Sequence, residues 1–95
     1  MYARHVSGFI LPDQLDNAIQ LWSDSVLPSV QQKKGFKSVR LLVSRKNAKI
    51  VSIGLWDTEA DFQATIEWNN EQINQFVELF TTPPLVEGFE VVVDV

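Results

Sequence analysis

The sequence predicts an α+β domain of the ferredoxin-like βαββαβ kind, in which two helices cover one face of a four-stranded antiparallel sheet. Two observations support this fold class. The hydrophobic periodicity changes along the chain in the order strand, helix, strand, strand, helix, strand. Each change lies beside a turn or helix-end signal, such as Pro12, Gly35 or Asn47. We therefore expect residues 1–95 to form a single domain.

Composition excludes several kinds of chemistry. The chain has no cysteine and a single histidine, His5, so disulfides, thiolate metal sites and multi-histidine sites within one chain are excluded. The net charge of -4 argues against a general nucleic-acid-binding protein. No apolar run approaches the ~20 residues that cross a bilayer. We expect a cytoplasmic protein with neither nucleic acid nor membrane as a partner.

The first strand and helix follow from the pattern of apolar residues. Residues 2–10 alternate loosely with period two, which predicts a strand. Pro12 suits the first turn of the helix that follows. The apolar stripe of this helix comprises Leu15, Ala18, Ile19, Trp22, Val26 and Val30. Pro28 cannot donate a backbone hydrogen bond, so we expect a kink or break there, and Gly35 marks the end of the helix.

The middle of the chain predicts a β-hairpin. Residues 36–44 and 49–56 both read as strands, and the four residues RKNA join them. Asn47 suits a turn position that needs a positive φ.

The second helix has a capping signal at its start. Thr58 and Asp61 fit the pattern in which a threonine side chain caps a helix. Apolar residues then recur at helical spacing over residues 62–80, with an irregularity expected near residues 68–72. Residues 89–95, FEVVVDV, are the predicted last strand.

The face of the sheet that the helices leave uncovered bears on assembly. We expect this face to carry alternate residues of the two hairpin strands: Phe36, Ser38, Arg40 and Leu42, with Ile50, Ser52, Gly54 and Trp56. Monomers rarely expose an apolar patch of this kind. We therefore predict a homodimer in which two sheets face each other and close a dimeric α/β barrel.

The segment GFKSVRLLVSRKNAKIVSIGLWDTEADFQA, residues 35–64, is similar to the antibiotic biosynthesis monooxygenase-like (ABM) family of dimeric α+β barrels. The residues that carry the resemblance are Leu27-Pro28, Gly35-Phe36 and, after the hairpin, Trp56, Thr58 and Phe62. The order of elements matches over nearly the whole chain. The resemblance implies a pocket between sheet and helices or inside the barrel. It also implies oxidation of an aromatic phenol, anthrone or quinol by dioxygen without metal or flavin.

A second branch of the family degrades haem. It uses an asparagine, a tryptophan and a histidine, and an approximate alignment places His5, Thr65 and Gln75 at these positions. Because all three differ, the resemblance does not extend to haem degradation, and we expect no cofactor.

The candidate site combines two charged groups with a set of pocket residues. Histidine is the residue type whose unperturbed pKa lies near neutrality, so His5 is the candidate base, and Arg40, a charge in mid-strand, is the candidate group that holds a phenolate. The candidate substrate-binding residues are Phe36, Ser38, Ser52, Gly54, Trp56, Trp68 and Asn69. Structural alternatives stay open: a core position for Trp56, ion pairs or hydrogen bonds at the dimer seam for the two charges, and a helix break at residues 68–70.

Two functions therefore follow from the sequence. The first is a cofactor-independent monooxygenase acting on a small aromatic phenol or quinol, and the second is a non-catalytic homodimer that binds a small ligand or serves as an interaction module. Seven of the 8 Lys and Arg residues lie between Lys33 and Lys49. We interpret them as a solvated hairpin and helix end, or else as a surface that attracts an anionic partner.

Overall fold

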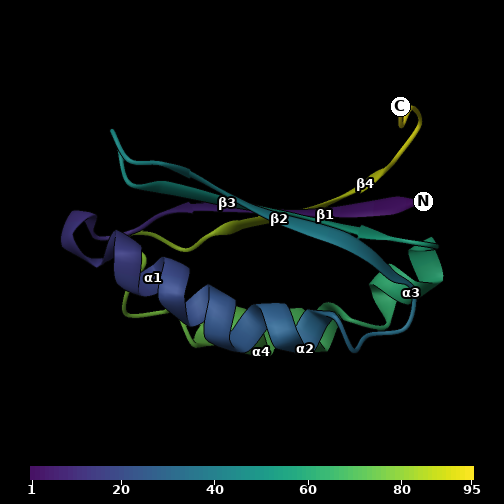
Figure 1. The fold of residues 1–95 in the computed structure, drawn as a ribbon, viewed down its shortest axis with the longest axis horizontal. Helices are drawn as coiled ribbons and strands as arrows, with labels where there is room; N and C mark the ends of the chain where they lie inside the picture. The colour runs from purple at the N-terminus through teal and green to yellow at the C-terminus, as the bar shows by residue number, and fades with distance from the viewer.

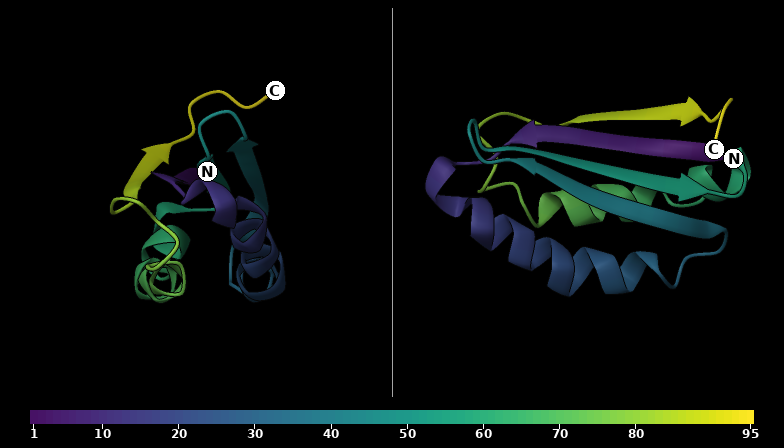
Figure 2. Two further views of the ribbon diagram at one scale, coloured as in Figure 1. Left: turned by 90° about the vertical axis from the view of Figure 1, so that its left-hand side faces the viewer. Right: turned by 45° about the horizontal axis from the view of Figure 1, so that its top comes forward.

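Four antiparallel strands form the sheet of this protein, and the computed structural model describes all of residues 1–95 (Figure 1). The strands are β1 (Tyr2–Phe9), β2 (Phe36–Ser44), β3 (Lys49–Trp56) and β4 (Leu85–Glu90). They lie in the order β2-β3-β1-β4, and each neighbouring pair is antiparallel. Figure 2 shows the two helical segments side by side under one face of this sheet. The predicted ferredoxin-like fold class is confirmed.

The first helical segment contains a π-helical stretch just before Pro28, the residue at which the sequence predicted a kink or break. Its parts are η1 (Pro12–Gln14), α1 (Leu15–Leu21), the π-helix η2 (Trp22–Val26) and α2 (Leu27–Val30). The N–H of Leu27 bonds to the carbonyl of Trp22, five residues back. This wider turn accommodates the ring of Pro28, so the segment continues in one direction (Figure 1). No helix is both long and apolar enough to span a membrane.

The hairpin has the predicted strand boundaries, but its strained residue is Ala48 rather than Asn47. Ala48 has a φ of 55° and is the only non-glycine residue with positive φ. It is buried, and its carbonyl accepts the N–H of Ile10 at 2.9 Å. This tertiary contact holds the left-handed conformation at a residue that has no intrinsic preference for it.

The second helical segment begins as predicted and is interrupted earlier than predicted. Thr58 caps α3 (Glu59–Gln63), since its Oγ1 accepts the N–H of Asp61 at 3.0 Å. The interruption lies at Ala64 and Thr65, not near residues 68–72, and α4 (Ile66–Asn74) is regular through that stretch. The hydroxyl of Thr65 donates to the carbonyl of Phe62 at 2.8 Å, a local bond that competes with helix continuation.

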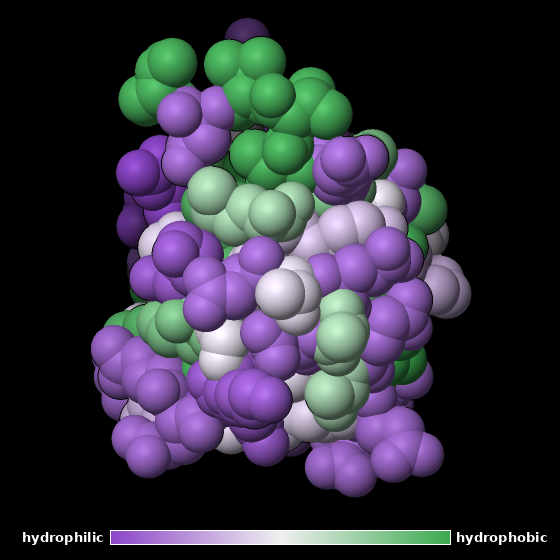
Figure 3. All heavy atoms as spheres, turned by 90° about the vertical axis from the view of Figure 1, so that its right-hand side faces the viewer, coloured by the Kyte–Doolittle hydropathy of each residue, from purple (hydrophilic) through white to green (hydrophobic).

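The last strand lies earlier than residues 89–95. In β4, Glu90 already pairs with Tyr2, and the N–H of Val91 bonds to the carbonyl of Met1 at 3.0 Å. Residues after Val91 therefore lie beyond the first residue of β1 and have no neighbour in the sheet. Figure 3 shows apolar atoms gathered at the top of this view, on the sheet side of the molecule. The exposed valines of this segment are Val92, Val93 and Val95.

The predicted faces of the hairpin strands are wrong for β3 and for one residue of β2. Ile50, Ser52, Gly54 and Trp56 face the helices, where Ile50 and Trp56 belong to the core. A β-bulge lies between Phe36 and Ser38, so Phe36 faces the helices beside Trp56. Beyond the bulge, Ser38, Arg40 and Leu42 lie on the uncovered face, as predicted.

The uncovered face is nevertheless apolar, which keeps the homodimer as our prediction. Leu42 and Phe89 are 46% and 49% exposed on this face. Val51, Ile53 and Leu55 of β3 lie between them in the pairing register. An exposed apolar surface of this kind is typical of an interface.

We expect light scattering to find a dimer at micromolar concentration. The paired substitution Leu42→Lys and Phe89→Lys places charges on the uncovered face and should give a folded monomer by circular dichroism. Val77→Lys, at a side chain 67% exposed on the helix side, is the control and should leave the dimer intact. A wild-type monomer at this concentration would refute the dimer.

Candidate functional site

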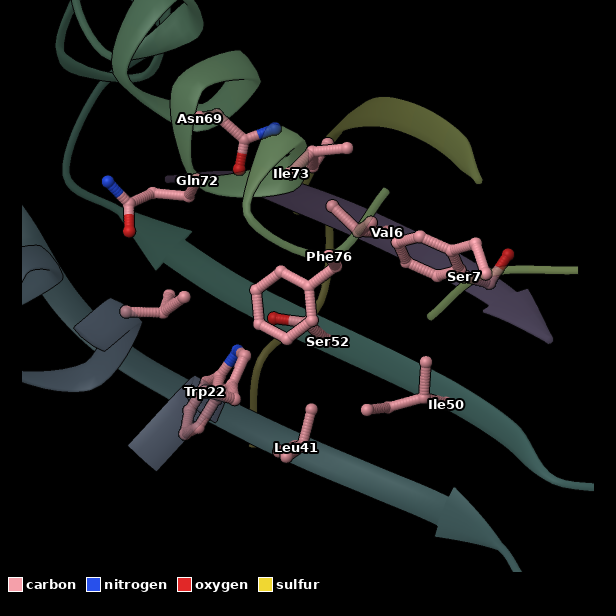
Figure 4. Close-up of a pocket in the computed structure, with 12 residues that line it drawn as sticks. Val6, Ser7, Trp22, Leu41, Ile50, Ser52, Asn69, Gln72, Ile73 and Phe76 are labelled. Atoms are coloured by element: carbon pink, nitrogen blue, oxygen red, sulfur yellow. The ribbon is translucent and has the colours of Figure 1, made fainter. Parts of the chain in front are cut away.

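An apolar cavity of about 60 Å³ lies between the sheet and the helices (Figure 4). Its floor is formed by Val6 of β1, Leu41 of β2, and Ile50 and Ser52 of β3. The helical side contributes Trp22, Val26, Asn69, Gln72, Ile73, Phe76 and Phe80. The polar groups in its wall are neutral hydroxyls and amides, and none of its side chains titrates near neutral pH. This cavity can hold an apolar ligand but offers no acid or base.

A second cavity, of about 30 Å³, adjoins the first. The two share Val6, Val26, Ser52 and Asn69. Arg4, Gly54, Trp56 and Trp68 belong to the smaller cavity alone, with Val30 and Val39. The structure thus brings together five of the predicted substrate-binding residues: Ser52, Gly54, Trp56, Trp68 and Asn69. That they bind a ligand stays a prediction.

Arg4 is the charged group of this site, and the sequence analysis did not identify it. The side chain is only 5% exposed. Its Nη1 donates to Thr65 Oγ1 at 3.1 Å and its Nη2 to the carbonyl of Phe62 at 3.2 Å. The guanidinium carbon lies 4.5 Å from the ring centroid of Phe62 and 5.8 Å from that of Trp56. No carboxylate forms an ion pair with it.

Burial of Arg4 changes its proton affinity without removing its charge. Desolvation lowers the pKa of the guanidinium to about 10, because the charged form loses its hydration. At neutral pH the group therefore keeps its proton. The result is a positive charge beside an apolar cavity.

Trp56 is both a core residue and a wall of the smaller cavity. It is 1% exposed, and the ring of Phe36 packs against it edge-on at 6.0 Å between centroids. Its Nε1 has no hydrogen-bond partner, whereas Nε1 of Trp68 donates to Ser29 Oγ at 2.7 Å. Buried donors are normally paired, so the indole N–H of Trp56 is a free donor in the site.

The predicted base and anion holder lie on the other face of the sheet. His5 and Arg40 are in one row across the strands, because each pairs with Ile53 from opposite sides. Two strand spacings separate them by roughly 10 Å. Nδ1 of His5 lies 4.0 Å from a carboxylate oxygen of Glu87. The expectation that His5 and Arg40 share a pocket with Ser52, Gly54 and Trp56 is wrong, and their catalytic roles stay predictions.

A larger, open hollow of about 360 Å³ lies outside the cavities, between the end of α4 and the segment 81–84. Ile73 and Phe80 line both this hollow and the cavity of about 60 Å³. These two side chains therefore lie between the cavity and the hollow. No group of three or more His, Asp or Glu side chains is placed to hold a metal ion.

Two of the basic residues between Lys33 and Lys49 pair with carboxylates. Lys37 pairs with Asp57 at 3.0 Å, and Arg45 pairs with Asp16 at 3.0 Å, both at exposed positions. Arg40 lies on the uncovered sheet face.

Comparison with known proteins extends these observations. No protein-family model matches the chain. Two uncharacterised proteins of Mycobacterium tuberculosis, from strains H37Rv and CDC 1551, are each 39% identical over 62 residues. The match covers 65% of this chain and 26% of each relative, so the chain spans about a quarter of the length of these curated relatives.

Solved structures resemble nearly the whole chain. A monooxygenase from the gene ActVA-Orf6 of Streptomyces coelicolor, solved in complex with the ligand nanaomycin D, superposes with a TM-score of 0.81 at 15% identity, covering 99% of this chain and 89% of that one. A putative antibiotic biosynthesis monooxygenase from Deinococcus radiodurans gives 0.82 at 12% identity, covering 100% and 96%. A protein of unknown function from Nitrosomonas europaea gives 0.80 at 18%, covering 98% and 90%. The chain therefore has the fold of ABM-like proteins, and the resemblance seen in the sequence is confirmed at the level of the fold.

We expect Arg4→Met to change the free energy of unfolding by less than about 1.5 kcal/mol, because the substitution roughly conserves volume and removes a desolvated charge. Thr65 still satisfies the carbonyl of Phe62 in this variant. Phe62→Ala, a truncation beside Arg4, should instead cost about 3–5 kcal/mol. Urea unfolding followed by circular dichroism measures both. A loss above roughly 3 kcal/mol in Arg4→Met would mean that Arg4 is a structural residue.

Proposed function

We propose that the protein is a cofactor-independent monooxygenase that oxidises a small aromatic phenol or quinol in the cavity between its sheet and helices. The observation that carries the proposal is the wall of this cavity, which is mostly apolar and whose polar groups are neutral, among them Ser7, Ser52, Asn69 and Gln72. Such a wall suits an aromatic ring and orients it through a few hydrogen bonds. It supplies no acid, base or metal ligand, so the substrate must carry the chemistry itself.

A quinol with an unsubstituted ring carbon can do this. Its ionised ring gives four electrons to dioxygen, a C–O bond forms at that carbon, and the O–O bond breaks. One oxygen atom stays on the ring as a hydroxyquinone and the other leaves as water, so no external reductant is needed. The protein contributes a dry site and a fixed orientation of the ring towards dioxygen. The fold shared with a monooxygenase solved with nanaomycin D supports this proposal.

The size of the cavity sets a requirement for binding. A volume of about 60 Å³ holds dioxygen or a few water molecules. Pockets for drug-sized ligands measure roughly 300–1,000 Å³. An aromatic ring therefore displaces side chains as it binds, and Ile73 and Phe80 are placed to move, because the hollow of about 360 Å³ lies directly behind them. Their displacement joins the cavity to the hollow and gives the substrate its route inwards.

Two alternatives rest on specific observations. A wall without acid or base equally suits a protein that binds a small apolar ligand without converting it. In a dimer built on the uncovered face, His5 and Arg40 would instead lie between the two sheets. There they would keep the roles of base and anion holder, and the reaction would take place inside the barrel.

Oxygen uptake with a panel of naphthoquinols and anthrones, corrected for autoxidation, tests these alternatives. We expect uptake in the wild type and at least a roughly tenfold loss in Ser52→Leu, about 1.4 kcal/mol of barrier, because leucine fills the cavity. Ser44→Leu, at an exposed residue at the end of β2, is the matched control.

Two other outcomes would support the alternatives, a reaction between the sheets or ligand binding without conversion. Uptake that survives in Ser52→Leu but is lost in His5→Ala and Arg40→Ala would move the reaction between the sheets. Binding of the quinols without uptake above autoxidation would leave the ligand-binding function.

A further inference from the structure

We propose that the smaller cavity is a binding site for an anionic oxygen, held by the guanidinium of Arg4 and the indole N–H of Trp56. The oxygen belongs to an ionised phenol or to reduced dioxygen, which present the same chemistry to these two donors. The anion site itself does not depend on the proposed function. Only the identity of the ligand that supplies the oxygen rests on it.

The first argument is the charge of Arg4. A buried charge without a partner is costly, and at 5% exposure this guanidinium has no carboxylate beside it. A guanidinium has five N–H donors, and the two hydrogen bonds to Thr65 and Phe62 use two of them. Both acceptors are neutral oxygens, so they fix the orientation of the group without neutralising it. An anion in the cavity would supply the missing charge.

A purely structural role for Arg4 accounts for less of the site. In that reading Arg4 only ties β1 to the junction between α3 and α4, through Thr65 and the carbonyl of Phe62. That carbonyl already accepts the hydroxyl of Thr65 at 2.8 Å, so it is satisfied without Arg4. Nor does the structural reading explain why Trp56, 1% exposed in the same cavity, leaves its Nε1 unpaired. An unpaired buried donor costs free energy that a bound acceptor would restore.

The second argument is that both donor residues line the same small cavity. Gly54 lies in the cavity wall, and a Cβ atom at this position would stand 3.6 Å from Nε1 of Trp56. Nε1 of Trp56 is itself buried, and the absence of a side chain at position 54 leaves no further atom between it and the cavity. A volume of about 30 Å³ accepts a small anion or one oxygen substituent, but not a ring. The ring of a phenolate would lie in the adjoining apolar cavity, across the shared residues Ser52 and Asn69.

Two small ligands test the site directly. Azide represents a small anion such as reduced dioxygen, and its binding is measured by calorimetry. 4-Nitrophenol represents a phenol, and its visible absorption reports the ionised form, so the pKa of the bound molecule is measured spectroscopically. We expect the wild type to bind azide and to lower the pKa of bound 4-nitrophenol.

Three variants test whether binding depends on the residues of the site: two alter the site and one is a control. Arg4→Met should weaken both ligands at least tenfold and abolish the pKa shift of 4-nitrophenol, with a melting temperature near that of the wild type. Gly54→Ala should weaken azide binding, since its methyl group stands in front of Trp56 Nε1 at ordinary contact distance and needs no rearrangement. Arg45→Met removes an exposed charge elsewhere and should bind as the wild type does.

The pattern of binding identifies the source of the oxygen. Binding of azide alone, dependent on Arg4, supports the site and assigns it to reduced dioxygen. Binding of 4-nitrophenolate that depends on Arg4 supports the site and assigns it to the substrate, whether or not azide competes with it. If neither ligand depends on Arg4, the proposal is overturned. Arg4-dependent binding without oxygen uptake by any quinol keeps the anion site and overturns the monooxygenase.

Discussion

Side chains of a β-strand alternate between the two faces of its sheet, and in this protein that alternation decides which groups meet. On β1 it sends Arg4 towards the helices and the next residue, His5, to the uncovered face. On β3 it places the small residues Ser52 and Gly54 under the helices, where larger side chains would fill the cavities. One sheet thus has two chemically different surfaces: an inner face with a buried charge and free volume, and an outer face suited to another sheet.

The inner surface differs from an ordinary protein core, because it contains a charge and an unpaired hydrogen-bond donor. Apolar residues surround the cavities, and we expect an apolar residue in place of Arg4 to change the stability of this core only slightly. A charge without a counter-ion and an indole N–H without an acceptor lie at the same cavity. Functional sites commonly sacrifice stability in this way, because groups that await a ligand are unsatisfied without it. The two features together point to a ligand with an anionic oxygen.

Local signals predicted much of this structure, and tertiary contacts explain the remainder. The hairpin boundaries and the Thr58 cap depend on neighbours in sequence and were confirmed. The sequence could not show which face of β3 points to the helices, because apolar residues occur on both faces. A bulge after Phe36 reverses the face on which that residue of β2 lies. Candidate pocket residues such as Trp56 do line a cavity. Arg4 was missed because histidine, not arginine, is the usual general base, and the burial of a charge appears only once the helices are in place.

A crystal structure of the protein with bromide would test the central claim most directly, because the anomalous signal of bromide locates the anion without assumptions about chemistry. The account predicts a bromide ion in the smaller cavity, in contact with the guanidinium of Arg4 and with Nε1 of Trp56. Bromide found only at surface lysines, with the cavity between Arg4 and Trp56 closed or holding neutral water, would contradict it.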